Sequence, residues 1–431
     1  MNSKKMLMLI AAAVVLVGLA HWSSRRRDSG RAVARRIGTP VLPAFQDVDT
    51  VNRIARMTFV SPGSTVEVAR VDGTWVAPGQ YGYPVKFENV REFALSLVNL
   101  KIGHVLSASE VRRKRLGLLP PADERADRAS SGTQVVLADE HGVTLAELIV
   151  GNEFQGPEDL ESPMAGYGGM PQGRYVATDE EMIVVSELFH GLPRKAQDWL
   201  DDDLVHVAGS DIAKIELAHP ERDRLVLRRP ETGGNLTLSD LGAQEEMNTS
   251  KLGGLSGVLS HLRFADVADP ALADEAMGLD RPVVLTAETR DGTRYRLDVG
   301  NKAGDTDDRY VRLSADWIET ESPGSVQDET SDKTPADEVD VADAEDDEAE
   351  KDRQEREKKR AELEALNAQW SAWTYILPSY KIHHVMAARE DLVQEKKAKA
   401  KSEAGEPDKT VPDDGDSEKK PGFFRRMFGR D

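Results

Sequence analysis

The stretch GLDRPVVLTAETRDGTRYRLDVGN, from Gly278 to Asn301, carries the clearest structural pattern in this chain. Apolar and polar residues alternate along it, which predicts two β-strands joined by a tight turn. A related stretch, GLLPPADERADRASSGTQVVLADEHGVTLAELIVGN, ends at Asn152. Both begin with Gly-Leu and end with Gly-Asn, so the chain carries one strand pair twice.

The segments that flank these two stretches also recur in the same order. A hairpin pattern and an amphipathic helix precede each copy, and an Arg-Tyr-Val strand follows each. The matching pairs are Ile54 with Ile212, Gly117-Leu118 with Gly278-Leu279, Gly151-Asn152 with Gly300-Asn301, and Arg174-Tyr175-Val176 with Arg309-Tyr310-Val311. This ordered recurrence predicts an α+β protein with two tandem repeats, residues 47–208 and 209–393. Each repeat is expected to be a mainly antiparallel sheet with packed helices.

Two segments depart from globular composition. Residues 319–350 are acidic and poor in large apolar residues, which predicts a disordered insertion within the second repeat. Residues 351–369 carry opposite charges three and four positions apart and predict a charged helix. The tail at 394–431 is again expected to be disordered.

The N-terminus predicts a membrane anchor. Residues 1–5 are a short basic region, and residues 6–22 are uncharged and almost wholly apolar. This length fits a short transmembrane signal-anchor, and a basic tether follows at 23–46. A cleaved signal peptide ending near Gly18-Leu19-Ala20 is the alternative.

The orientation of this anchor has two readings. The arginines after the apolar stretch favour a cytoplasmic body by the positive-inside rule. Long domains translocate largely regardless of flanking charge, and the layout resembles a signal sequence. We therefore expect a single-pass protein of the bacterial inner membrane with a periplasmic body.

Composition excludes several classes of function. The 431-residue chain has no cysteine, which rules out disulfides, thiolate zinc sites and a cysteine nucleophile. Its formal net charge of -20 argues against nucleic-acid binding, because phosphates would be repelled.

No catalytic, cofactor or metal site emerges from the motifs. The glycine-rich loop at 166–173 lacks the lysine and hydroxyl of a phosphate cradle. The aspartates at 201–203, and those at 305, 307 and 308, do not match a calcium loop. His383 and His384 are adjacent, so they point to different faces, and we expect one exposed and one packed imidazole. Ser256 lacks the second glycine of a nucleophile elbow.

The last residues form a basic-aromatic patch within PGFFRRMFGRD. Apolar side chains on one side of a short helix, with arginines beside them, are typical of a segment that contacts a membrane or a partner. An unstructured tail with no docking role is the alternative. The candidate contact residues are Phe423, Phe424, Arg425, Arg426, Met427, Phe428 and Arg430.

Several segments of the chain resemble the bacterial family DUF4340. They are the DGTW hairpin, the helix before Gly-Leu, the Gly278–Asn301 stretch with RYVRL after it, and the bridge AQDWLDDDLVHVAGSDIAKIEL. The resemblance covers residues 47–393 apart from the acidic insertion. It implies a single N-terminal helical anchor and protein partners among the permease or auxiliary subunits of ABC-type export systems similar to those of gliding motility. It implies no catalytic residues. We therefore expect a non-enzymatic accessory or scaffold protein of an envelope transport complex. The alternatives are an envelope hydrolase and a solute-binding module at the groove between the repeats.

Overall fold

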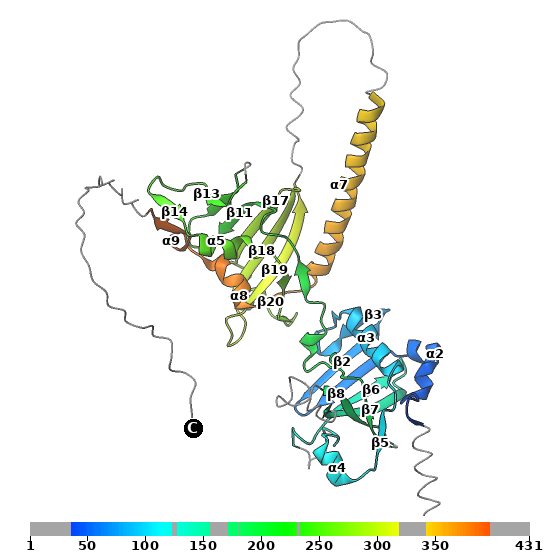
Figure 1. Ribbon diagram of the computed structural model, residues 1–431. Helices are drawn as coiled ribbons and strands as arrows, with labels where there is room; N and C mark the ends of the chain where they lie inside the picture. Colours follow the sequence, from blue (N-terminus) through cyan, green and yellow to red (C-terminus); the bar gives the residue numbers. More distant parts are fainter. Residues whose placement is uncertain are drawn as a thin grey trace, which may run out of the picture.

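The computed structural model describes residues 36–122, 127–155, 171–179, 181–230, 233–318 and 342–396, with only the backbone described over 342–352. These residues form an α+β protein with two large sheets whose paired strands run antiparallel (Figure 1). We call the elements of the nine-stranded sheet the first unit and those of the eight-stranded sheet the second unit. The expected α+β class with mainly antiparallel sheets is confirmed.

The first unit has the strand order β4-β3-β2-β1-β6-β7-β8-β9-β5. Its helical segments pack on this sheet or connect its strands. The strands are β1 (Arg56–Ser61), β2 (Ser64–Val71), β3 (Thr74–Ala77), β4 (Tyr83–Pro84), β5 (His104–Leu106), β6 (Thr133–Ala138), β7 (Thr144–Gln155), β8 (Pro171–Ala177) and β9 (Met182–Val185). The helical segments are η1 (Pro43–Gln46), α2 (Val48–Asn52), η2 (Pro78–Gln80), α3 (Phe87–Val98), α4 (Glu110–Arg115) and η3 (Ala196–Asp198).

The second unit has the strand order β13-β12-β11-β17-β18-β19-β20-β16. Two short strand pairs, β10 with β15 and β14 with β21, complete it. The strands are β10 (Asp203–Val205), β11 (Ile212–Ala218), β12 (Leu225–Arg228), β13 (Thr237–Leu238), β14 (Glu245–Met247), β15 (Leu262–Arg263), β16 (Asp266–Val267), β17 (Val283–Thr289), β18 (Thr293–Lys302), β19 (Arg309–Trp317), β20 (Tyr375–Leu377) and β21 (Val393–Glu395). The helical segments are α5 (Thr249–Ser256), α6 (Asp274–Met277), α7 (Ala342–Ser371), α8 (Ser379–Ile382), η4 (His383–Met386) and α9 (Arg389–Leu392).

The two sheets share one connectivity. Apart from β4, each strand of the first sheet has a counterpart at the same place in the second, and β5 and β16 occupy the same outer position. The helices α3 and α5 precede these outer strands, and α4 and α6 follow them. The repeated sequence signals therefore lie on corresponding elements.

Equivalent backbone hydrogen bonds close both units. In the first unit, Lys86 N donates to the carbonyl oxygen of Trp199 at 2.9 Å, immediately before α3 begins. In the second, Asn248 N donates to the carbonyl oxygen of Leu392 at 2.8 Å, immediately before α5 begins. The segment that ends each unit thus returns to the start of its main helix.

The core is continuous across both units. Alternate residues of the central strands are buried, as the period of a strand packed on one face requires. In the first unit, the rings of Phe59, Phe93 and Trp199 meet edge to face, with centroids 5.0 to 5.9 Å apart. Most buried apolar residues of the second unit belong to the same cluster, whereas Ala268, Met277 and Leu279 form a small separate one.

Helix α7 begins earlier than the expected boundary at 351. It spans Ala342–Ser371, so the expected disordered insertion at 319–350 is wrong for residues 342–350. No glycine or proline interrupts the sequence between Ala336 and Ser371, and alternating charges favour continuation of the helix. Residues 319–341 lie outside the described part of the chain.

Within the described residues, no helix has both the length and the apolar character needed to cross a membrane. The expected anchor at 6–22 precedes the first described residue, Arg36.

Candidate functional site

The repeated Gly-Leu and Gly-Asn signals form a structural contact in each unit. Gly278 has a left-handed backbone (φ 67°), and a Cβ there would lie 2.5 Å from Cγ of Asn301. Gly117 (φ 65°) approaches Asn152 equally closely, with 2.6 Å from its ideal Cβ to Oδ1. Only glycine fits such a position without strain. The signals that identify the repeat are thus explained by packing rather than by chemistry.

The arginine of each Arg-Tyr-Val strand completes this contact. Arg309 Nη1 donates to the carbonyl oxygen of Gly300 at 2.8 Å, and Arg174 Nη1 donates to that of Gly151 at 3.3 Å. Each guanidinium therefore ties the strand after the hairpin to the glycine that precedes the asparagine.

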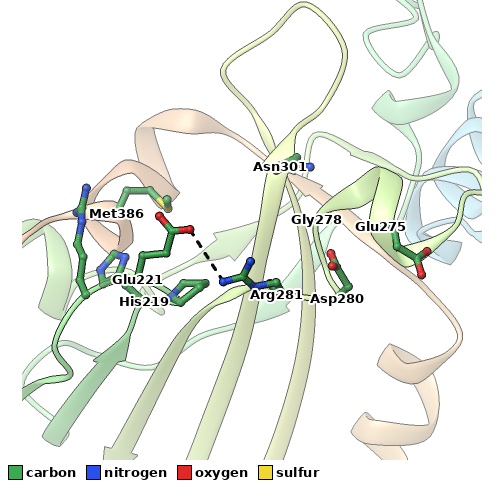
Figure 2. Close-up of a pocket in the computed structure, with 10 residues that line it drawn as sticks. His219, Glu221, Glu275, Gly278, Asp280, Arg281, Asn301 and Met386 are labelled. Carbon is green, nitrogen blue, oxygen red and sulfur yellow. Dashed lines mark ion pairs between the residues drawn. The ribbon is translucent and has the colours of Figure 1, made fainter.

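A polar pocket opens beside the Gly278–Asn301 contact in the second unit, with a volume of about 490 Å³. Figure 2 shows His219, Glu221 and Met386 on one side of Arg281, and Asp280 and Glu275 on the other. The turn after β11, α6, the loop between α6 and β17, β18 and η4 supply these residues. The lining consists of His219, Pro220, Glu221, Arg222, Glu275, Gly278, Asp280, Arg281, Asn301 and Met386.

His219 is a partly buried member of this pocket. Burial lowers the pKa of its imidazole, and the nearby Arg222 lowers it further. The ring is therefore neutral near pH 7. Its Nε2 is buried and has no hydrogen-bond partner among the described atoms.

The pocket rim is charged and open to water. Arg281 and Glu221 form a long ion pair, 4.0 Å between Nη2 and Oε1, with side chains 67% and 84% exposed. Such exposed pairs contribute little energy because water screens them. The arrangement can therefore receive a polar or charged group of a partner, and its open rim does not provide the water-excluded environment that strengthens electrostatic catalysis.

Aromatic side chains from both units pack together at the junction. Tyr83 of β4 is fully buried, and its ring centroid lies 5.1 Å from that of Phe264 and 4.9 Å from that of Trp373. Tyr375 of β20 lies 6.2 Å from Tyr83. We call Tyr83, Phe264, Trp373 and Tyr375 the junction cluster. Burial raises the pKa of Tyr375 to about 12 and also raises the pKa of Tyr83.

Polar contacts surround the junction cluster. The amides of Gln80 and Gln197 donate to the two carboxylate oxygens of Asp266 at 2.8 and 2.7 Å. The hydroxyl of Tyr83 donates to the carbonyl oxygen of Asp201 at 3.1 Å. Because Gln80 and Gln197 belong to the first unit and Asp266 to the second, the two hydrogen bonds to Asp266 join the units.

The aspartates at 201–203 belong to this junction. Lys86 contacts Asp202 at 2.5 Å and Asp203 at 3.4 Å, and Arg263 contacts Asp203 at 2.5 Å. Burial raises the pKa of Asp201. Burial also disfavours ionised Asp203, but Lys86 and Arg263 outweigh this and hold its pKa below the usual range. Asp202 and Asp203 thus form salt bridges where the second unit begins.

The other candidates separate in space. Asp307 pairs with Lys302, and Asp308 accepts a hydrogen bond from Ser379 N at 2.9 Å. His383 is exposed, whereas His384 packs against Gly254, as expected for one exposed and one packed imidazole. Among the residues that the structure describes, no group of histidines and carboxylates is placed to hold a metal ion.

Two expected features lie partly or wholly outside the described residues. The glycine-rich loop is described only from Pro171, where β8 begins. The basic-aromatic patch lies wholly outside, since the described chain ends at residue 396. Its residues are Phe423, Phe424, Arg425, Arg426, Met427, Phe428 and Arg430.

Sequence reasoning missed Tyr83 and His219. Tyr83 follows the left-handed Tyr81 in GQYGYP, a turn that gives no hint of a partner in the other unit. His219 precedes a proline at a strand end, and the residue that encloses it, Met386, is far away in sequence. Neither position belongs to a periodic pattern, so only the tertiary structure identifies them.

Comparison with known proteins gives a family and no relatives. The family model described as "Domain of unknown function (DUF4340)" matches residues 75–282. The match begins on β3, crosses the junction and ends just before β17, a narrower span than 47–393. No curated protein and no solved structure matches the chain significantly.

Proposed function

We propose that this chain, which carries a DUF4340 domain, is a membrane-anchored, non-enzymatic scaffold that binds protein partners of an envelope ABC-type transport or gliding-like complex. The observation that carries the proposal is the junction, where two units of the same connectivity are held together by four buried or half-buried aromatic rings. Stacked units with a shared core typically present an extended surface for binding other proteins.

The shared connectivity suggests how this body arose. We infer that the two units are copies of one ancestral α+β unit, since strand order, closing hydrogen bonds and glycine-asparagine contacts all correspond. Duplication adds surface without requiring new chemistry at either copy. This agrees with a binding role.

Helix α7 adds to the surface available to partners. Every side chain from Arg353 to Lys358 is exposed, whereas Leu363 and Trp370 of the same helix are buried. The helix is thus held at one end and solvated along the part before it. A charged helix of this kind contributes to binding through the charge pattern it displays.

The anchored, periplasmic arrangement rests on residues 6–22 and on the family resemblance. An anchor would hold the two units beside the membrane, where subunits of a transport complex lie. The junction cluster packs apolar rings where the two units meet, which favours a scaffold over a solute-binding module at that place.

Site-specific photo-crosslinking in cells tests this proposal. A photoreactive residue at Glu357 on α7 is expected to capture subunits of an ABC-type permease or its auxiliary proteins, identified by mass spectrometry. The same residue at Val143, in the turn between β6 and β7, serves as the control because that side chain is also exposed.

The result that would overturn the proposal is equally specific. Exposed positions on both units and on α7 would yield no crosslink to any membrane-complex subunit, although the protein remains folded and is extracted intact in mild detergent.

A further inference from the structure

The short helix α4 presents a concentrated positive surface. Its sequence, EVRRKR, ends in four consecutive basic residues. Val111, Lys114 and Arg115 are three and four positions apart, so they share one face, and all three are exposed. Val111 is 82% exposed, the highest value among the large apolar side chains that the structure describes. An apolar side chain flanked by cations thus points into solvent.

The fold does not require these charges. Basic residues in the last turn do favour a helix through its dipole. The counterpart helix α6 reads DEAM and carries no basic residue, yet it leads into the same left-handed glycine contact. In α6 the acidic Asp274 pairs instead with Arg312. One fold position therefore carries opposite charge in the two units.

Helix α4 lies at the end of the first unit where the described chain begins. Leu116, directly after α4, packs with Met182 in a small buried cluster. The neighbour of Met182, Glu181, accepts two hydrogen bonds from the guanidinium of Arg36, at 2.7 and 2.8 Å. Figure 1 shows α4 beside β5 at one end of the sheet. The first described residue therefore pairs with the neighbour of Met182, and Met182 packs with the residue that directly follows the basic helix.

The sequence that precedes Arg36 leads to the expected anchor. Residues 23–35 could span at most about 45 Å when fully extended, and a flexible chain of this length covers roughly 20 Å. This end of the first unit is thus close to the bilayer if the anchor is at 6–22. Arginines at 25, 26, 27, 31 and 35 give the same segment a positive charge.

We propose that the exposed face of α4 (Val111, Lys114 and Arg115, with Arg113 beside them) contacts anionic lipid headgroups. The proposal rests on the membrane anchor of the proposed function and adds the surface by which the body sits on the bilayer. Lysine and arginine near an anionic membrane surface each add to attraction, and a single apolar side chain can enter the interface beside them. Because the anchor keeps α4 nearby, a weak contact is populated through effective concentration.

A single labelled cysteine can test this contact, because the natural chain contains none. The full chain carrying Val111→Cys, labelled with a polarity-sensitive fluorophore, is placed in lipid nanodiscs of phosphatidylcholine, with or without phosphatidylglycerol. We expect a blue shift only with phosphatidylglycerol, reversed by high salt. A label at Val143→Cys is the control, since that turn lies at the opposite end of β7 from the residues beside α4.

Neutralising the helix tests the charge directly. The triple variant R113Q/K114Q/R115Q should lower the docking equilibrium roughly 100-fold, because each basic residue near an anionic surface contributes about a factor of five. The matched triple variant R228Q/K251Q/R290Q removes exposed basic residues of the second unit and should leave the signal unchanged. Thermal unfolding of both variants shows whether they remain folded.

The outcomes separate this proposal from the proposed function. If the chain enters both kinds of nanodisc but the label at 111 responds equally in both, the lipid contact is wrong and the anchor stands. If the chain enters neither, the anchor is wrong. Flotation with phosphatidylglycerol vesicles then tests the lipid contact of α4. If the chain does not bind these vesicles, the lipid contact is wrong. A response that requires an added acidic protein rather than lipid also overturns it.

Discussion

Asn367 of α7 hydrogen-bonds to the backbone of Ala315 in β19 as a neighbouring strand would. The amide of Ala315 donates to Asn367 Oδ1 at 2.8 Å, and Asn367 Nδ2 donates to the carbonyl oxygen of Ala315 at 2.6 Å. The strand β20 pairs with β19 only over Arg309–Val311, which leaves the rest of β19 as a sheet edge. Helix α7 thus covers this edge, and the side chain of Asn367 satisfies the backbone groups of Ala315.

Replacing Asn367 by alanine should loosen α7 from the sheet. Both backbone groups of Ala315 would lose this partner, at a cost of about 1–3 kcal/mol. Alanine favours helix formation more than asparagine does, so the change in helix propensity alone would stabilise α7. Hydrogen exchange should therefore quicken at Ala315 and around Trp370.

The control is Glu364→Ala, which changes an exposed residue of the same helix. It should leave exchange at Ala315 unchanged. Equal protection in Asn367→Ala and the unaltered chain would show that the side chain does not hold α7 in place.

Acid should also release α7, through Asp291. Lys359 Nζ lies 2.6 Å from Asp291 Oδ2. Burial disfavours the ionised carboxylate, but hydrogen bonds from Lys359 and Thr289 outweigh it and lower the pKa of Asp291 from 3.8 to about 2. A carboxylate whose pKa is depressed in the folded state stabilises the fold at pH values above its unfolded-state pKa. This stabilisation is lost as the pH falls through the folded-state pKa. The contribution of Asp291 to the stability of the fold is therefore full above pH 3.8 and disappears towards pH 2.

Exchange within α7, measured from about pH 5 down to about pH 2, should rise relative to the β6–β7 hairpin. Asp291→Asn should raise it already at neutral pH and flatten its dependence on pH. Asp307→Asn removes another carboxylate whose pKa is lowered by a lysine, but this pair lies in the turn after β18, so α7 should not respond. An unchanged pH profile in Asp291→Asn would contradict the assignment.

The sequence predicted the parts of the fold that depend on local signals. Gly278 and Asn301 recur as Gly117 and Asn152 because a left-handed glycine must accept the asparagine side chain at close range. Such a constraint requires the same two residue types at a spacing that can be recognised in the sequence. The α+β class and the antiparallel strand pairs follow from the same stretches.

Features formed between distant segments were not predictable in this way. Tyr83 meets Tyr375 across the junction, and nothing near GQYGYP marks a partner so far along the chain. The start of α7 at Ala342 was missed because acidic composition suggested an unstructured chain, although no glycine or proline lies between Ala336 and Ser371. His219 is a candidate only because the tertiary structure brings Met386 of η4 into the same pocket.

The glycine contact itself can be tested by adding one methyl group. Gly278→Ala would place Cβ 2.5 Å from Asn301 and would also require a left-handed alanine. We expect a loss of about 3 kcal/mol or more in the free energy of unfolding, from the left-handed backbone and the overpacking together. Urea denaturation measures this loss.

Gly304→Ala provides the matched control for this change. Gly304 has a similar backbone (φ 59°), but nothing lies within 4 Å of its ideal Cβ. It should lose only about 1–2 kcal/mol, the cost of a left-handed alanine. If the two variants lose the same amount, the close approach of Asn301 adds nothing to the requirement for glycine.

The junction cluster should couple the unfolding of the two units through Tyr83. Tyr83→Ala removes a fully buried ring that packs against Phe264, Trp373 and Tyr375 of the second unit, at a cost of about 3–5 kcal/mol. A single urea transition should then separate into two, because each unit keeps its own sheet. Hydrogen exchange should quicken in β15 and β16 but not in the β6–β7 hairpin. Tyr83→Phe keeps the ring and removes only the hydrogen bond to Asp201, about 1 kcal/mol, so it should retain the single transition. If Tyr83→Ala also unfolds in one transition with unchanged protection at the junction, the ring packing does not couple the units.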